Sequence, residues 1–211
     1  MKYILILTML LVSGCSSDFD KTMEKAKRGD ADAQFLVAVE YQYGFNMMAK
    51  DVVEASKWMR KSASQGFPEA QYLFGLSLAN GDGIPKNYSE AIDWLTKAAN
   101  QGNLVHQRTL GKVYAAGEIT PKDHNLASYW LSSAAKQGDA LSQHELAMSL
   151  EQLGDKVNAY YWWLIASAQG NEDAKNLLEL AESMLDEKLV AEAQALATKC
   201  YESDYKDCEV K

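Results

Sequence analysis

The stretch "WLTKAANQG", Trp94–Gly102, decides the fold because the chain contains it in nearly the same form four times. It recurs as "WMRKSASQG" from Trp58, "WLSSAAKQG" from Trp130 and "WWLIASAQG" from Trp162. The closing glycines of the four copies are 36, 36 and 32 residues apart. Repetition at a period of about 20–50 residues is typical of a solenoid, in which each repeat stacks on its neighbours.

The stretch itself is typical of the second half of an α-helix. Ala91, Trp94 and Ala98 are three and four residues apart, so they share one helical face. The alanines admit a neighbouring helix, and we expect the tryptophan to be a buried ring whose replacement by Ala costs about 3–5 kcal/mol. The closing glycine supplies the left-handed conformation that ends a helix. Residues favoured at helix starts follow or precede the copies: Asp30, Pro68, Asn103, Asp139 and Asn171.

A second helix is predicted between successive copies. In the second repeat it is "EAQYLFGLSLANG", Glu69–Gly81, and the turn "DGIPKN" joins it to the next helix. No alternating strand pattern occurs in this span. Each repeat is therefore predicted to be a helix–turn–helix, and the fold class to be all-α, an α-solenoid.

The residues Glu69–Asn103 resemble the Sel-one-like repeat (SLR), a relative of the tetratricopeptide repeat. Residues 104–139 match almost as well, the first repeat carries one extra residue in its turn, and the fourth is four residues shorter. The resemblance implies about four SLR repeats between a half-repeat cap and an atypical terminal helix pair. The expected segments are a signal peptide (1–14), a lipidated tether (15–18), a capping helix (19–29), repeats at 30–66, 67–102, 103–138 and 139–170, the terminal pair (171–200) and a disulfide-tied tail (201–211).

The amino terminus has the anatomy of an export signal. A short basic start precedes the nine-residue apolar run Ile4–Val12, which is too short to span a bilayer. Val12–Cys15 resembles a bacterial lipobox, which implies cleavage before Cys15 and a lipid on that residue; the alternative is a plain signal peptide with an incidental cysteine. By the rule for enteric lipoproteins, Ser16 favours the outer membrane. The expected location is thus the bacterial cell envelope, lipid-anchored in the outer membrane and facing the periplasm.

The remaining cysteines, Cys200 and Cys208, are eight positions apart in the tail. An exported chain is in a compartment that permits disulfides, so we expect these two to pair within one chain. A redox role would favour a Cys-x-x-Cys arrangement, and a metal site would need further ligands, which the tail lacks.

The composition and motifs indicate no catalytic site, cofactor or metal. The net charge of −8 disfavours a nucleic-acid partner, because phosphate contact needs a basic face. Ser133 and Lys136 form an S-x-x-K, the nucleophile pattern of serine β-lactamases, and some secreted SLR proteins carry that label. However, Ser133 occupies the position of Lys61 and Lys97 in earlier copies, and the partner motifs S-D-N and K-T-G are missing. Hydrolysis of β-lactams or wall fragments is therefore the weakest alternative.

Stacked helix pairs curve, so the first helices of successive repeats are expected to line a concave binding face. One row of positions there changes its chemistry from repeat to repeat, as a face specific for one ligand would; the alternative is that its apolar members pack between repeats. The row is Phe35, Val39, Tyr72, Leu76, Arg108, Lys112, His144 and Met148. We therefore predict a monomeric, non-catalytic, membrane-anchored scaffold or adaptor that binds an unidentified protein. Since some periplasmic SLR lipoproteins are immunity proteins, neutralising a periplasm-delivered effector is the alternative.

Overall fold

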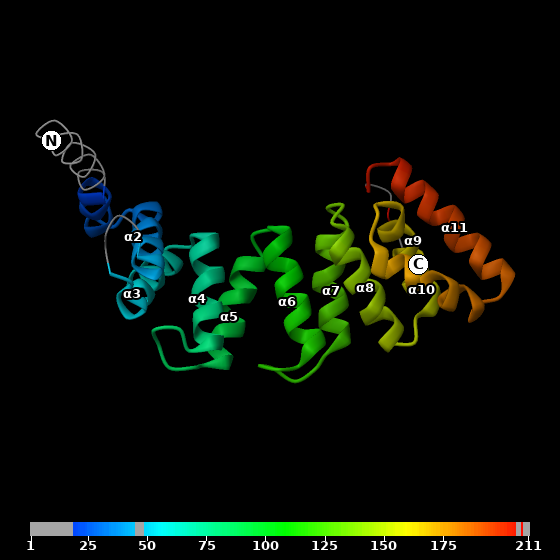
Figure 1. Ribbon diagram of the computed structural model, residues 1–211, viewed down its shortest axis with the longest axis horizontal. Helices are drawn as coiled ribbons and strands as arrows, with labels where there is room; N and C mark the ends of the chain where they lie inside the picture. Colours follow the sequence, from blue (N-terminus) through cyan, green and yellow to red (C-terminus); the bar gives the residue numbers. More distant parts are fainter. Residues whose placement is uncertain (1–18, 45–48, 206–207, 209–211) are drawn as a thin grey trace, which may run out of the picture. The chain divides into compact units, whose positions relative to one another are not determined.

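The computed structural model describes residues 19–44, 49–205 and 208, and in this part of the chain all regular secondary structure is helical (Figure 1). The predicted signal peptide and Cys15 lie outside the described residues. None of the described helices is long and apolar enough to cross a membrane. The chain divides into two compact units, Met1–Ala98 and Ala99–Lys211. The fold class predicted from the sequence, an all-α solenoid of helix pairs, is confirmed.

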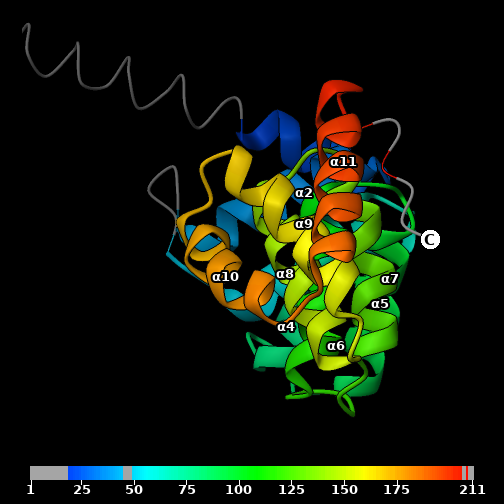
Figure 2. The ribbon, with the colours of Figure 1, turned by 90° about the vertical axis from the view of Figure 1, so that its right-hand side faces the viewer.

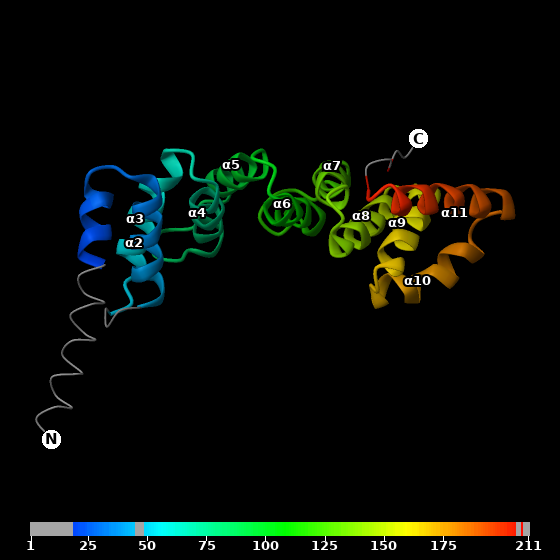
Figure 3. The same cartoon turned by 90° about the horizontal axis from the view of Figure 1, so that it is seen from above.

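The first unit begins with helical residues 19–27 and continues with helix pairs. Helix α2 packs on α3, and α3 packs in turn on α4 (Figure 3). Helix α5 packs on α4 through its tryptophan, since the rings of Phe74 and Trp94 meet edge to face at 5.7 Å. The bounds are Ala31–Tyr43 for α2, Val52–Ser64 for α3, Pro68–Asn80 for α4 and Tyr88–Ala99 for α5.

The second unit contains three further helix pairs. Helices α6 to α9 pack in chain order, and α10 and α11 both pack on α9, which lies between them in Figure 2. Its core is centred on Tyr160, Tyr161, Trp162 and Trp163, which are all buried. The bounds are Leu104–Ala116 for α6, His124–Ala135 for α7, Ala140–Gln152 for α8, Lys156–Ala168 for α9, Glu172–Ser183 for α10 and Glu187–Glu202 for α11.

The predicted start and stop signals operate as expected. The side chains of Asp30, Asn103, Asp139 and Asn171 each accept a hydrogen bond from a backbone N–H in the first turn of the helix that follows. Pro68 occupies the first helical position of α4. The closing glycines adopt the left-handed conformation that favours glycine, with φ between 86° and 92° at positions 66, 102, 138 and 170.

A glutamine clamp, which the sequence analysis missed, joins each first helix to the helix before it. Its members in the second unit are Gln107 and Gln143, whose side-chain Nε2 atoms donate to the carbonyls of Ala99 and Ala135. The side-chain oxygens of the same two glutamines accept from Gln137 and Gln169, at 2.8 and 2.6 Å. In the first unit, Gln34 donates to Ala26 and accepts from Gln65, and Gln71 donates to Ala63. Each of these carbonyls also accepts from the backbone N–H of the glycine three residues later, so the glutamine supplies its second hydrogen bond and fixes the end of the preceding helix.

The tryptophans of the repeated stretch differ in burial, which corrects one expectation. Trp58, Trp130 and Trp162 are buried, as predicted. Trp94 is only partly buried. Its indole N–H donates to Glu90, and the ammonium of Lys97 lies 4.0 Å from a ring centroid, so one side of the ring is covered by polar side chains of its own helix. The full cost expected for a buried tryptophan does not apply at this position.

The terminal segment ends later than the sequence suggested. Helix α11 continues through Glu202, two residues beyond the expected end of the terminal pair at residue 200. Asp204 and Tyr205 then adopt φ values of 53° and 63°, which reverse the chain. The reversal brings Cys208 to Cys200, and the two are joined by a disulfide. Both cysteines are buried and form part of the core of the second unit.

Candidate functional site

The predicted row falls into two groups, one in each unit. In the first unit all four members, Phe35, Val39, Tyr72 and Leu76, are partly buried. Phe35 on α2 packs against Phe67, directly before α4, with ring centroids 5.0 Å apart. At this end of the row, packing between repeats accounts for the aromatic side chain, as the alternative hypothesis proposed.

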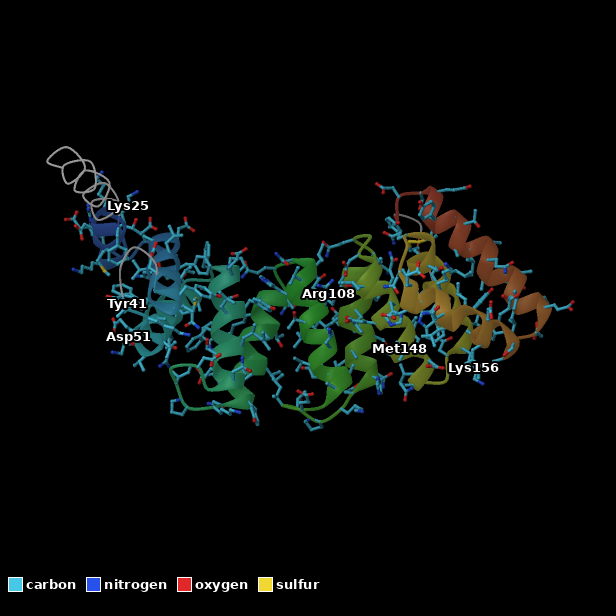
Figure 4. All side chains as sticks on the ribbon, viewed as in Figure 1. Lys25, Tyr41, Asp51, Arg108, Met148 and Lys156 are labelled. Atoms are coloured by element: carbon cyan, nitrogen blue, oxygen red, sulfur yellow. A yellow bond between two sulfur atoms is a disulfide. The ribbon has the colours of Figure 1, made fainter. Side chains whose placement is uncertain are left out.

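In the second unit the row members of α6 make ion pairs with the next repeat. Figure 4 labels two row members of this unit, Arg108 on α6 and Met148 on α8. Arg108 donates to the carboxylate of Asp139 at 2.7 Å, and each side chain is about one-fifth exposed. Lys112 lies 2.9 Å from Glu145 on α8, with the lysine largely exposed. Arg108 is thus committed to a contact within the chain, whereas Lys112 can also reach a partner.

Asp139 has two roles at this junction. Its carboxylate caps α8 through Ser142 and also accepts from Arg108. Burial by itself would raise the pKa of Asp139, but the hydrogen bonds from Ser142 and Arg108 outweigh burial and hold that pKa below its ordinary value. The carboxylate is therefore charged at neutral pH, and the ion pair that joins α6 to α8 is present.

A groove of about 400 Å³ lies beside the Lys112–Glu145 ion pair, in the second unit. Residues of α6, α7 and α8, with Lys122 from the turn before α7, form its walls. Two of the predicted row residues, Lys112 and Met148, line it, and Arg108 and His144 do not. Met148 is 39% exposed, which leaves a flexible apolar side chain open to a ligand. The other lining residues are Ala115, Ala116, Lys122, His124, Leu131, Glu145, Ser149 and Gln152.

Two polar atoms of the groove residues have no hydrogen-bond partner among the described residues. They are Nδ1 of His124 and Oε2 of Glu145, both buried at the atomic level. A buried polar atom without a partner is costly, so a ligand that displaces the side chains covering either atom and hydrogen-bonds to it would be favoured. Neither residue was predicted from the sequence. The signal available was the spacing of Glu145, Met148 and Gln152, which are three and four residues apart and share a face of α8.

The residues weighed for catalysis are not arranged as an active site. The hydroxyl of Ser133 donates to the carbonyl of Tyr129, one turn earlier in the same helix, and no hydrogen bond joins Ser133 to Lys136. Lys136 is the exposed residue at the end of α7. In the described part of the chain no group of three or more His, Cys, Asp or Glu side chains could hold a metal ion. The S-x-x-K pattern is accounted for by ordinary helix geometry.

The Sel1 repeat matches the sequence four times in succession, over residues 31–67, 68–103, 107–139 and 140–171. The chain belongs to the Sel1 repeat family. The matches agree with the helix pairs of the structure and confirm the resemblance drawn from residues 69–103. A Sel1 repeat scaffold suits protein–protein interaction, because stacked helix pairs present wide side-chain surfaces.

Solved structures of this family have the same fold. A Sel1 repeat protein from Oxalobacter formigenes is 26% identical, with a TM-score of 0.66, and the match covers 80% of this chain and 73% of that one. A protective antigen of uropathogenic Escherichia coli with an SLR fold is 29% identical, with a TM-score of 0.69 over 89% of this chain. This chain spans only 41% of the antigen's length.

An immunity protein from Pseudomonas aeruginosa is 23% identical over 90% of this chain and 75% of its own length. Its TM-score of 0.42 is too low to support an inference about function. No curated protein sequence matches this chain significantly.

Proposed function

We propose that this Sel1 repeat protein is a non-catalytic, membrane-anchored scaffold of the bacterial envelope. It binds a protein partner through the groove between α6 and α8. The observation that carries the proposal is the groove itself, where exposed Met148 lies near a buried carboxylate oxygen of Glu145 that has no donor among the described residues. Small ligand sites are usually more enclosed, and an open groove with an apolar side and a charged side suits a peptide segment.

The chemistry of the groove defines the contacting segment. Ala115, Ala116 and Met148 offer an apolar surface for one side chain of the partner. Glu145 offers an acceptor for a backbone N–H or a basic side chain, and Lys112 and Lys122 offer donors for a carbonyl or carboxylate. We expect the segment to place an apolar residue on Met148 with a hydrogen-bond donor beside it.

Site-specific photo-crosslinking in intact envelopes tests this surface. A photoreactive residue at Met148 should trap one defined protein, and the same residue at exposed Lys136, outside the groove, should not. Met148→Arg should weaken binding of the trapped protein by about 1–3 kcal/mol, since apolar contact is replaced by charge. Equal trapping at both positions, or normal binding by Met148→Arg together with loss in Lys136→Glu, would show that another face binds the partner.

The membrane anchor is a separate part of the proposal and rests on the lipobox-like Val12–Cys15. Cys15→Ser should leave an unprocessed or freely soluble exported protein, because the acceptor of the lipid is removed. Metabolic labelling with a fatty acid measures this directly, and label that persists in Cys15→Ser refutes the anchor. An immunity role remains a narrower form of the same proposal. It requires that deletion of this protein make cells sensitive to their siblings.

A further inference from the structure

A second groove, distinct from the one between α6 and α8, follows α11 along its length. One hollow of about 520 Å³ lies between α10 and the first half of α11. Another of about 600 Å³ lies between α9 and the second half of α11. Gln194 lines both hollows, so they meet at the middle of the helix.

The groove runs along most of the length of α11. Its α11 side is formed by Glu187, Val190, Gln194, Thr198 and Tyr201, which recur at intervals of three and four residues and so share one face. Helix α11 has 16 residues, which corresponds to a length of about 24 Å. An extended channel of this kind accepts an α-helix laid side by side with α11.

The floor of the groove is apolar in its second half and partly apolar in its first. Leu164, Ile165 and Ala168 of α9 face the second hollow, and Val190 and Leu185 face the first. Tyr160 is buried beneath this region. Its hydroxyl donates to Glu182 and accepts from Gln194, at 3.3 and 3.2 Å, which holds two groove residues in place. The floor is thus a fixed surface for apolar side chains.

The rim of the first hollow is acidic. Glu179, Glu182 and Glu187 line it, and none of them takes part in an ion pair within the described residues. The nearby lysines are engaged elsewhere, Lys175 with Glu172 and Lys188 with Glu192. Between residues 171 and 202 the chain has eight acidic and three basic side chains. This excess attracts a basic partner and opposes a second copy of the same acidic surface.

We infer that the groove along α11 binds an amphipathic α-helix of a protein partner, apolar on the side that faces α9 and basic where it passes α10. The site does not depend on the groove between α6 and α8.

The binding can be measured with two fluorescein-labelled helical peptides of sixteen residues and the full exported chain. One peptide has leucines on one face and lysines on the other, and the second has glutamates in place of the lysines. The lysine peptide should bind and the glutamate peptide should not. Glu179→Lys should weaken the lysine peptide about tenfold, because the rim then repels it.

Glu192→Lys is the matched control, since it changes the net charge equally from a position of α11 that lines neither hollow. It should alter binding less than about twofold. Equal affinity for the two peptides, no affinity for either, or equal loss in Glu179→Lys and Glu192→Lys would overturn the inference. So would a concentration-dependent dimer in sedimentation that Glu179→Lys abolishes, because the occupant would then be a second copy.

Discussion

The second helices of the second and fourth repeats, α5 and α9, carry the same Trp-to-Gly stretch in different surroundings. Trp94 on α5 is partly buried and shielded by Glu90 and Lys97 of its own helix. Trp162 on α9 is 1% exposed. The matched positions explain the difference. Asp93 of α5 corresponds to buried Tyr161 of α9, and exposed Lys97 corresponds to a buried isoleucine.

The comparison shows what a repeat unit determines and what its neighbours determine. The stretch itself specifies a helix, the spacing of its small residues and its glycine stop in both places. Burial of the outer face depends on whether other helices cover it. Helix α9 is packed against α8, α10 and α11, and its outer face has exchanged charges for aromatic and aliphatic side chains. The fourth repeat is therefore the part of the unit on which the terminal helices α10 and α11 pack.

The largest expected difference is between the tryptophans. Trp162→Ala should lower the free energy of unfolding by about 3–5 kcal/mol, the usual cost of deleting a fully buried large aromatic side chain. Hydrogen exchange during chemical denaturation measures the effect, and the loss of protection should concentrate in α8 to α11. A loss below about 1 kcal/mol would mean that the aromatic cluster of α9 is not the core of its unit.

The disulfide is the second feature that only the fourth-repeat region has. Replacing both Cys200 and Cys208 by serine should cost about 2–3 kcal/mol, because the short closed loop no longer restricts the unfolded chain. The tail should also loosen, since Tyr205 lies against Gly138, at the turn that precedes α8. Thiol counting on the exported, non-reduced protein should find neither cysteine free. Two reactive thiols would contradict the pairing.

The glutamine clamp tests what the two regions share. Gln143→Leu should cost about 1–2 kcal/mol, because the side chain of Gln169 loses its partner and the carbonyl of Ala135 keeps only the hydrogen bond from Gly138. Gln34→Leu in the first unit, which breaks the same two kinds of hydrogen bond, should cost a similar amount by urea denaturation. A large cost at one position and none at the other would show that the clamp is not a common element of the repeats.

Much of this was predictable from the sequence, and the failures have a common cause. Caps such as Asn103, stops such as Gly102 and close approaches such as Gly75, where a Cβ would lie 2.9 Å from Leu95, follow from short-range pattern. The burial of Trp94 and the set of residues that line the groove between α6 and α8 depend on which side chains of adjacent repeats meet. Lys112 meets Glu145 across two helices, a pairing that periodicity within one helix does not specify. The clamp was visible as glutamines at positions 34, 71, 107 and 143, but a polar residue at a repeated position is easily taken for surface.

At Trp94 a smaller effect is expected. Trp94→Ala should cost about 1–2 kcal/mol, since only part of the ring leaves water on folding and Lys97 covers another part. Hydrogen exchange in α4 and α5 during chemical denaturation measures this cost, and it can be compared directly with the cost of Trp162→Ala. A cost equal to that of Trp162→Ala would mean that the polar cover of Glu90 and Lys97 is as effective as burial between helices.

The smallest effect concerns the residues at which the two helix pairs begin. The pair containing α5 begins at Phe67, which packs on an aromatic ring, whereas the pair containing α9 begins at Asp139, which binds Arg108. The pKa of Asp139 is lowered in the folded state, so the stability it contributes is present above its unfolded pKa, about 4, and is lost as the pH falls through the folded pKa.

Asp139→Asn retains a capping side chain but removes the charge, and it should cost about 0.5–1 kcal/mol at neutral pH. The variant should also lose part of the acid-induced weakening of α8 and α9, measured by hydrogen exchange between pH 6 and pH 3, with α4 and α5 as the internal control. If acid weakens α8 and α9 equally in the variant and the original protein, the ion pair between Arg108 and Asp139 is not what makes the start of α8 sensitive to pH.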